Sequence, residues 1–145
     1  MATITVSDQI AAPVVVVFAR FTDLEGCSKR VTGIQKMEML STGPFGLGTR
    51  WRETREVLGH LDTAEMEVTA YEKNRTYTIT HRKLAAKIDT VFTFETFDGG
   101  TRVNVELSLT GPGLPPGLLT PIEWAITGAV RQVLTQDIAD LKESI

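Results

Sequence analysis

Cysteine and histidine are almost missing from this sequence, and their scarcity removes several classes of site. Cys27 is the only cysteine among 145 residues, so the chain forms no internal disulfide and no thiolate cluster for zinc. No histidine lies near Cys27 in sequence, which favours an inert thiol over a reactive nucleophile. The two histidines, His60 and His81, stand in no metal-binding pattern, so we predict neither a metal nor a cofactor.

Long apolar runs and basic runs are lacking as well. No stretch approaches the roughly 18 uncharged apolar residues of a membrane span, and Met1–Asp8 lacks the regions of a signal peptide. The 15 basic and 18 acidic residues are spread along the chain and give a formal net charge of −3, so no basic surface for nucleic acid is expected. We therefore predict a cytoplasmic protein with no nucleic-acid partner.

The composition that is present is that of a folded domain. Hydrophobic residues make up 42% of the chain and charged residues 23%, and a chain of this length buries roughly two thirds of its unfolded surface. We find no repeat, and the only stretch dense in proline and glycine, Gly111–Gly117, lies between the last predicted strand and a helix. The sequence predicts a single domain over residues 1–145.

The first thirty residues predict one strand and two short helical segments. Thr3–Ile10 alternates apolar and polar residues, which is typical of a strand with one buried face. Val14–Phe21 is β-branched, but Pro13 suits a first helical turn and the apolar residues fall on one helical stripe, so we predict a helix. Asp23–Arg30 is polar and contains Gly26, which predicts a short helical turn or a loop.

The middle of the chain predicts a run of antiparallel strands. The alternating segments are Gln35–Leu40, Thr49–Val57, His60–Tyr71, Arg75–His81, Lys87–Glu95 and Arg102–Leu109. Three of their connections, Leu58–Gly59, Glu72–Asn74 and Asp98–Gly100, supply the glycine or asparagine that hairpin turns need. Sequential hairpins indicate an antiparallel meander.

The C-terminal segment predicts a long amphipathic helix. Thr120 and Glu123 have the spacing of a capping box, with Pro121 at the first helical position. About 25 residues of helix extend about 37 Å, enough to cross a sheet. Apolar residues recur along it at helical spacing, whereas Asp137 is among the polar residues assigned to its other positions. The predicted fold is α+β: a curved, seven-stranded antiparallel sheet closes on this helix around an apolar cavity.

Four local segments resemble the START-like (SRPBCC) helix-grip superfamily, which has the Bet v 1-like fold. They are Ile10–Phe18, Gly48–Arg52, the pair Val91–Glu95 and Gly100–Val103, and Asp140–Lys142. The order of elements is also similar, and the bacterial polyketide cyclase/dehydrase-type branch is the most similar one. The resemblance implies a helix-grip fold whose cavity, between sheet and helix, holds hydrophobic or polycyclic small molecules. It implies no fixed catalytic set, because the superfamily includes transport proteins, hormone receptors and aromatic cyclases.

Strand alternation identifies residues that line such a cavity. On the segment Thr49–Val57, one face carries Trp51, Glu53 and Arg55, so we expect Trp51 to form a cavity wall. Glu53 and Arg55 are charges on an inner face, where they either contact a ligand or lie near the cavity mouth and reach solvent. Two residues apart, they are expected to pair only imperfectly.

A second inner face carries a possible proton carrier. Tyr77, Ile79 and His81 alternate inward on one strand, which makes His81 the best general acid or base, or else a structural histidine. Phe92 and Phe94 are core or cavity wall on the same argument. His60 follows a turn and is expected at a solvated tip.

Two further ligand-binding residues are expected on the long helix. Trp124 is placed to roof the cavity entrance. Gly128 leaves room for a ligand or for close approach of the sheet, or it is merely tolerated in the helix. The loop Gly43–Gly48 is predicted to be a hairpin tip that gates the cavity.

Two functions follow for this monomer or homodimer. The first is binding of a hydrophobic or polycyclic small molecule, lipid- or polyketide-like, by shape and a few polar groups. The alternative is a polyketide cyclase/dehydratase-type enzyme that uses His81 or Glu53 to move protons. A co-chaperone role would need an exposed apolar patch, which the sequence does not show.

Overall fold

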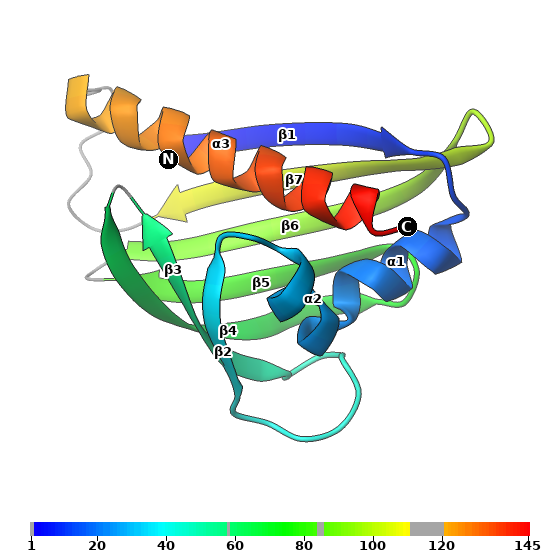
Figure 1. Cartoon of the computed structure of the whole chain (residues 1–145), viewed down its shortest axis with the longest axis horizontal. Helices are drawn as coiled ribbons and strands as arrows, with labels where there is room; N and C mark the ends of the chain where they lie inside the picture. The colour runs from blue at the N-terminus through cyan, green and yellow to red at the C-terminus, as the bar shows by residue number, and fades with distance from the viewer. Residues whose placement is uncertain (1, 58, 84–85, 111–120) are drawn as a thin grey trace.

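The computed structural model describes residues 2–57, 59–83, 86–110 and 121–145, with the backbone alone at residues 2, 57, 83 and 121–127. Within these ranges, seven strands and three helices follow one another in the predicted order (Figure 1). The strands are β1 (Ala2–Ile10), β2 (Ile34–Met39), β3 (Arg50–Val57), β4 (His60–Glu72), β5 (Thr76–Lys83), β6 (Ala86–Phe97) and β7 (Gly100–Thr110). The helices are α1 (Val14–Thr22), α2 (Leu24–Arg30) and α3 (Pro121–Glu143). The predicted fold class is confirmed.

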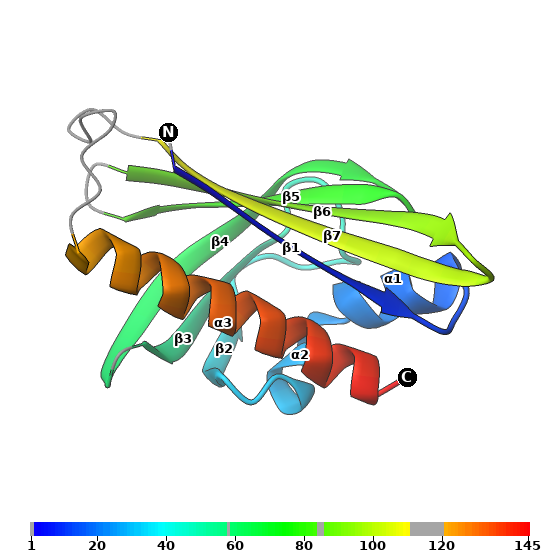
Figure 2. The same ribbon diagram turned by 90° about the horizontal axis from the view of Figure 1, so that it is seen from above.

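All seven strands form one antiparallel sheet in the order β1-β7-β6-β5-β4-β3-β2. Consecutive strands from β2 to β7 are neighbours, as hairpins require, and β1 closes the far edge against β7. Asn74 and Gly99 have φ angles of 62° and 79° in the turns where the sequence supplies residues that tolerate positive φ. Figure 2 shows the sheet bending around α3, with both short helices on the same side.

A bulge in β4 changes which residues of the strand, even-numbered or odd-numbered, face the inside of the sheet. The register to β5 shifts between Val68 and Ala70. Before the shift, even-numbered residues such as Val68 face inward, and after it Tyr71 does. One extra residue thus bends the strand without turning its apolar side chains to solvent.

The two short helices fill one end of the concave face. Val17, Phe18 and Phe21 of α1 are buried, and the burial of this stripe explains why β-branched residues form a helix here against their strand propensity. The Asp23 side chain caps α2 by accepting a hydrogen bond from Gly26 N–H at 3.2 Å.

Aromatic rings make the core at this end. Phe94 contacts Phe18 and Phe21 edge-on at centroid distances of 5.2 and 5.4 Å. Phe45, from the β2–β3 loop, packs on Tyr77 at 5.1 Å. The predicted gating loop Gly43–Gly48 is thus held against the core through Phe45, which is not among the residues lining the cavity described below.

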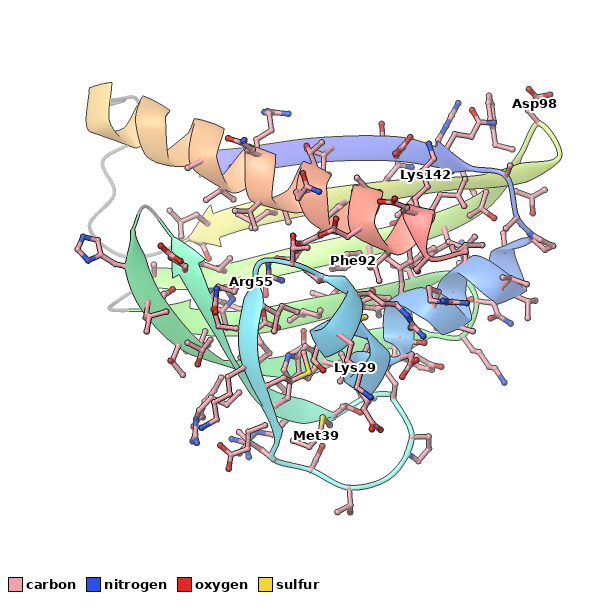
Figure 3. All side chains as sticks on the ribbon, viewed as in Figure 1. Lys29, Met39, Arg55, Phe92, Asp98 and Lys142 are labelled. Atoms are coloured by element: carbon pink, nitrogen blue, oxygen red, sulfur yellow. The ribbon has the colours of Figure 1, made fainter. Side chains whose placement is uncertain are left out.

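Helix α3 spans from this core to the opposite end of the sheet. Ile138 and Leu141, in its second half, are buried in the same core as the α1 rings. The helix begins at Pro121, as predicted, whereas Thr120 and the side chain of Glu123 lie outside the described residues. Figure 3 shows Arg55 and Phe92 between the sheet and the helices, and Asp98 at a hairpin tip. No helix within the described ranges is long and apolar enough to cross a membrane.

Candidate functional site

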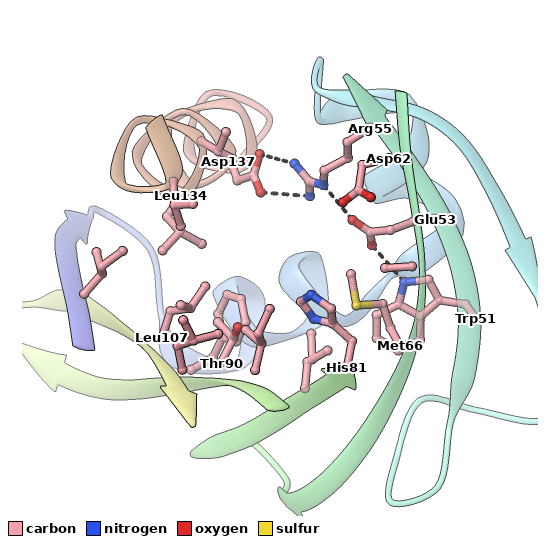
Figure 4. Close-up of a pocket in the computed structure, with 18 residues that line it drawn as sticks. Trp51, Glu53, Arg55, Asp62, Met66, His81, Thr90, Leu107, Leu134 and Asp137 are labelled. Carbon is pink, nitrogen blue, oxygen red and sulfur yellow. Dashed lines mark hydrogen bonds and ion pairs between the residues drawn. The ribbon is translucent and has the colours of Figure 1, made fainter. Parts of the chain in front are cut away.

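A cavity of about 400 Å³ lies between the inner face of the sheet and the middle of α3, from Val130 to Asp137 (Figure 4). Six strands, β1 and β3 to β7, and helix α3 contribute its lining. Most of the described lining side chains are aliphatic or aromatic. A space of this size with an apolar wall is typical of a site for a small hydrophobic molecule.

Strand register determines which side chains face the cavity. Pairs of residues opposite each other on β3 and β4 form its polar side: Trp51 with Met66, Glu53 with Ala64, and Arg55 with Asp62. On β5 and β6, His81 lies opposite Ile88. Because paired residues in neighbouring antiparallel strands point to the same side of the sheet, the register gathers these side chains around one space.

The opposite wall of the cavity is aliphatic. Strands β1 and β7 contribute Ile4, Leu107 and Leu109, and helix α3 contributes Val130, Val133 and Leu134. The cavity therefore has a polar end near β3 and β4 and an apolar end near β1 and β7. Figure 4 shows this division, with Leu107 and Leu134 across the space from Arg55 and Asp62.

A chain of hydrogen bonds and ion pairs crosses the polar end from the sheet to the helix. Trp51 Nε1–H donates to Glu53 Oε1 at 2.9 Å, and Arg55 Nε–H donates to Glu53 Oε2 at 2.6 Å. The Arg55 guanidinium then binds Asp137 of α3 through both terminal nitrogens, at 3.0 and 2.9 Å. Paired N–H groups on two carboxylate oxygens are the strong, directional arrangement for arginine. This network fixes α3 to β3 beside the cavity.

The pKa values of the network reflect burial opposed by pairing. Burial raises the pKa of Asp137 above its ordinary value, although the adjacent Arg55 guanidinium lowers it. For Arg55 burial lowers the pKa, but Asp137 and Glu53 outweigh it, so the guanidinium pKa stays above its usual range. Arg55 is therefore a permanent cation held between two carboxylates.

A second, smaller hollow of about 80 Å³ lies on the other side of this network, toward α2. Tyr77 and Cys27 are among its lining residues. Burial, and secondarily the charge of Asp23, raises the pKa of Cys27 to about 12. Burial also raises the pKa of Tyr77 well above its ordinary value. At neutral pH both groups are uncharged.

Six of the ten residues predicted to contact a ligand line the large cavity: Trp51, Glu53, Arg55, Ile79, His81 and Phe92. Tyr77 lines the small hollow and stacks on Phe92 at 4.7 Å. Phe94 lies in the aromatic core, because the helices α1 and α2 cover that end of the inner face. Gly128 is exposed on α3, and the Trp124 side chain lies outside the described residues.

Glu53 and Arg55 on β3 pair more closely than their sequence spacing predicted. Glu53 and Arg55 bind each other directly although they stand only two residues apart, because both project from one face of a twisted strand. Their side chains are 8% and 19% exposed, so they do not extend into solvent.

Asp137 is the main lining residue that sequence reasoning missed. It was assigned to the polar side of the helix, but its intervals from Leu134 and Leu141 are three and four residues, which place it on the apolar stripe. This spacing is the sequence signal that Asp137 faces the inside of the protein. Thr90, Asp62 and Met66 also line the cavity and were not singled out. Within the described ranges, no cluster of His, Cys, Asp or Glu has the arrangement of a metal site.

The sequence profile of the polyketide cyclase/dehydrase and lipid transport family matches residues 1–143. The chain belongs to this family. The resemblance to START-like helix-grip proteins is thereby confirmed.

Solved structures of known proteins show the same fold. The Zhui aromatase/cyclase from Streptomyces aligns with a TM-score of 0.76 and 17% identity over 99% of this chain and 92% of its own. Major latex-like protein 151 from Panax ginseng aligns at 0.77 with 12% identity, over 99% and 96%. Ara h 8.0201 aligns at 0.77 with 19% identity, also over 99% and 96%. No curated protein sequence matches the chain.

Proposed function

We propose that this protein binds one hydrophobic small molecule, lipid- or polyketide-like, in the cavity between the sheet and α3. The observation that carries the proposal is the cavity itself: about 400 Å³, with an aliphatic wall and a few polar groups at one end. Sites for small molecules have volumes of about 300–1,000 Å³ and this combination of walls. The family assignment, which includes lipid transport, supports the same function.

The proposed ligand lies with its apolar body against Leu107, Leu109 and Leu134 and its polar end near Arg55 and Asp62. Apolar surface withdrawn from water contributes about 25 cal/mol per Å², so the aliphatic wall supplies most of the affinity. The polar groups orient the molecule. We further propose that residues 1–145 act as a single ligand-binding domain, since α3 and the sheet share one core.

A variant that fills the cavity tests this proposal. Ala64 lines the cavity beside Glu53, and Ala64→Phe places a ring in the space the ligand would occupy. The neutral fluorescent probe N-phenyl-1-naphthylamine is expected to bind the wild type with enhanced emission. Its affinity for Ala64→Phe is expected to be lower by about tenfold or more. Equal binding by both proteins would exclude this cavity as the site.

Leu61→Phe is the matched control. Leu61 lies on the same strand, three residues away, and is exposed. The same ring added there is expected to leave probe binding unchanged. A loss of binding in both variants would indicate damage to the fold rather than a filled cavity, and the thermal unfolding transition of each variant distinguishes the two cases.

A second candidate function is chemistry on the bound molecule, as in a polyketide cyclase/dehydratase. The observation that favours it is His81, whose imidazole points into the cavity from β5 (Figure 4). An imidazole there is placed to accept a proton from a carbon flanked by two carbonyls, before ring closure and loss of water. Glu53, the other candidate acid or base, accepts a hydrogen bond at each oxygen, from Trp51 and from Arg55, so a proton transfer to Glu53 would displace one of these donors.

The variant His81→Ala separates catalysis from binding. If His81 moves protons, cyclisation of a poly-β-ketone substrate is expected to stop, while probe affinity stays within about threefold of wild type. Parallel loss of both properties, or unchanged cyclisation, would leave binding as the function.

A further inference from the structure

Negatively charged groups outnumber positively charged groups around the cavity. Among the described lining residues, Glu53, Asp62 and Asp137 contribute three carboxylates, whereas Arg55 contributes the one guanidinium. His81 is the other titratable group of this described lining. The polar end is therefore rich in hydrogen-bond acceptors, and its permanent positive charge is confined to Arg55.

Arg55 is already engaged by two of these carboxylates. Its Nε–H binds Glu53 at 2.6 Å, and its terminal nitrogens bind both oxygens of Asp137 at 3.0 and 2.9 Å. These contacts use three of the five N–H donors of the guanidinium. An anionic ligand that approached Arg55 would also meet the negative charges of Glu53 and Asp137, which outnumber its single positive charge. The network is a neutralised arginine rather than an anion-binding site.

The Asp137 carboxylate, in contrast, keeps the capacity to accept further hydrogen bonds. An ionised carboxylate has about four lone-pair positions, and the two oxygens of Asp137 each bind one nitrogen of Arg55. Figure 4 shows Asp137 and Asp62 on either side of Arg55 at the edge of the cavity. A hydrogen-bond donor brought to this position meets acceptors, whereas a second anion meets like charge.

We propose that the cavity selects a ligand whose polar end is a hydrogen-bond donor, an alcohol, a phenol or an amine, and rejects one that ends in a carboxylate, sulfonate or phosphate. This inference rests on the proposed function, because it concerns the chemistry of the ligand held in the same cavity. It places the ligand's apolar body at the aliphatic wall and its donor at the carboxylates. Free fatty acids and phosphorylated lipids are then excluded as ligands, and hydroxylated polycyclic or long-chain molecules are favoured.

Three naphthalene derivatives that differ only in their polar end test the proposal. Naphthalene-2-methanol is neutral, naphthalene-2-methylamine is a cation at neutral pH, and naphthalene-2-sulfonate is an anion that does not protonate. Isothermal titration calorimetry on the full chain is expected to give dissociation constants about tenfold or more lower for the alcohol and the amine than for the sulfonate. Binding of the sulfonate as tightly as the alcohol would overturn the proposal.

The variant Asp137→Asn identifies the source of the selectivity. It keeps the shape of the side chain and removes one negative charge beside Arg55, so the difference between alcohol and sulfonate is expected to narrow by about threefold or more. Asp140→Asn is the matched control, since Asp140 lies one turn further along α3, away from the cavity, and accepts hydrogen bonds from Thr32. It is expected to leave the difference unchanged.

Failure of this inference is distinguishable from failure of the proposed function. Binding of N-phenyl-1-naphthylamine that is lost in Ala64→Phe supports the cavity as a binding site whatever the calorimetry shows. If that probe binds while the alcohol and the amine do not, or while the sulfonate binds best, the donor preference is wrong and the site remains. The wild-type series is decisive even if Asp137→Asn unfolds.

Discussion

Replacing Arg55 with methionine removes the cation that both Glu53 and Asp137 contact. The side chains of these two carboxylates are only 8% and 22% exposed, so both would remain in a poorly solvated space without a partner. Removing one member of a buried ion pair costs about 3–5 kcal/mol. Because Asp137 retains some contact with solvent, we expect Arg55→Met to lower the free energy of unfolding by about 3 kcal/mol near neutral pH.

The loss of unfolding free energy in Arg55→Met should depend on pH, because the charge of Asp137 does. Burial raises the folded-state pKa of Asp137 although Arg55 lowers it, so loss of Arg55 raises this pKa further. A carboxyl group whose pKa is raised by folding destabilises the protein as the pH rises from the unfolded to the folded pKa. The penalty of Arg55→Met relative to wild type is therefore expected to shrink as the pH is lowered from about 7 to about 5.

Urea unfolding of matched variants measures this effect. Arg52 lies on the same strand and also contacts two glutamates, Glu38 and Glu65, but on the exposed face, so Arg52→Met is expected to change stability little. Combining Arg55→Met with Glu53→Gln and Asp137→Asn removes all three charges and should recover most of the loss. Equal costs for Arg55→Met and Arg52→Met, or a penalty that grows at low pH, would contradict a buried network that depends on Arg55.

Two further predictions concern the core. Phe94→Ala removes a ring that contacts Phe18 and Phe21, and we expect it to lower the free energy of unfolding, measured in urea, by about 3–5 kcal/mol. Phe97 is more exposed, and Phe97→Ala should lower this free energy by less than about 1 kcal/mol. Similar values for the two variants would contradict the placement of Phe94. Cys27 is buried with a pKa of about 12, so a thiol-specific reagent at about pH 8 should modify it only as fast as the protein opens, with a rate that rises with urea. Rapid modification of the native protein would contradict that burial.

The order of elements was predictable because the signals are local. Alternation along a strand and helical spacing along α3 require only neighbouring residues, and Asn74 and Gly99 mark turns through their own backbone preferences. Even the helix at Val14–Thr22 was predictable, since Pro13 and the stripe of Val17, Phe18 and Phe21 outweigh strand propensity.

The cavity was only partly predictable because it depends on distant contacts. Alternation places Phe92 and Phe94 on one face, but it does not tell which position along the strand is covered by α1 and which borders the cavity. Arg55 and Asp137 are 82 residues apart in sequence, and no local pattern pairs them. Asp137 also shows that a charged residue on an apolar helical stripe indicates a buried partner.

The proposed function requires that one hydrophobic molecule lies between the sheet and α3. Backbone amide chemical shifts, recorded by NMR with and without saturating naphthalene-2-methanol, test it most directly. The largest changes are expected on residues that line the cavity, such as Ile79, Thr90, Leu107 and Leu134, whereas the outer-face residues Arg52 and Glu65 are expected to change little. Changes confined to the outer face, or scattered over the surface, would contradict the claim.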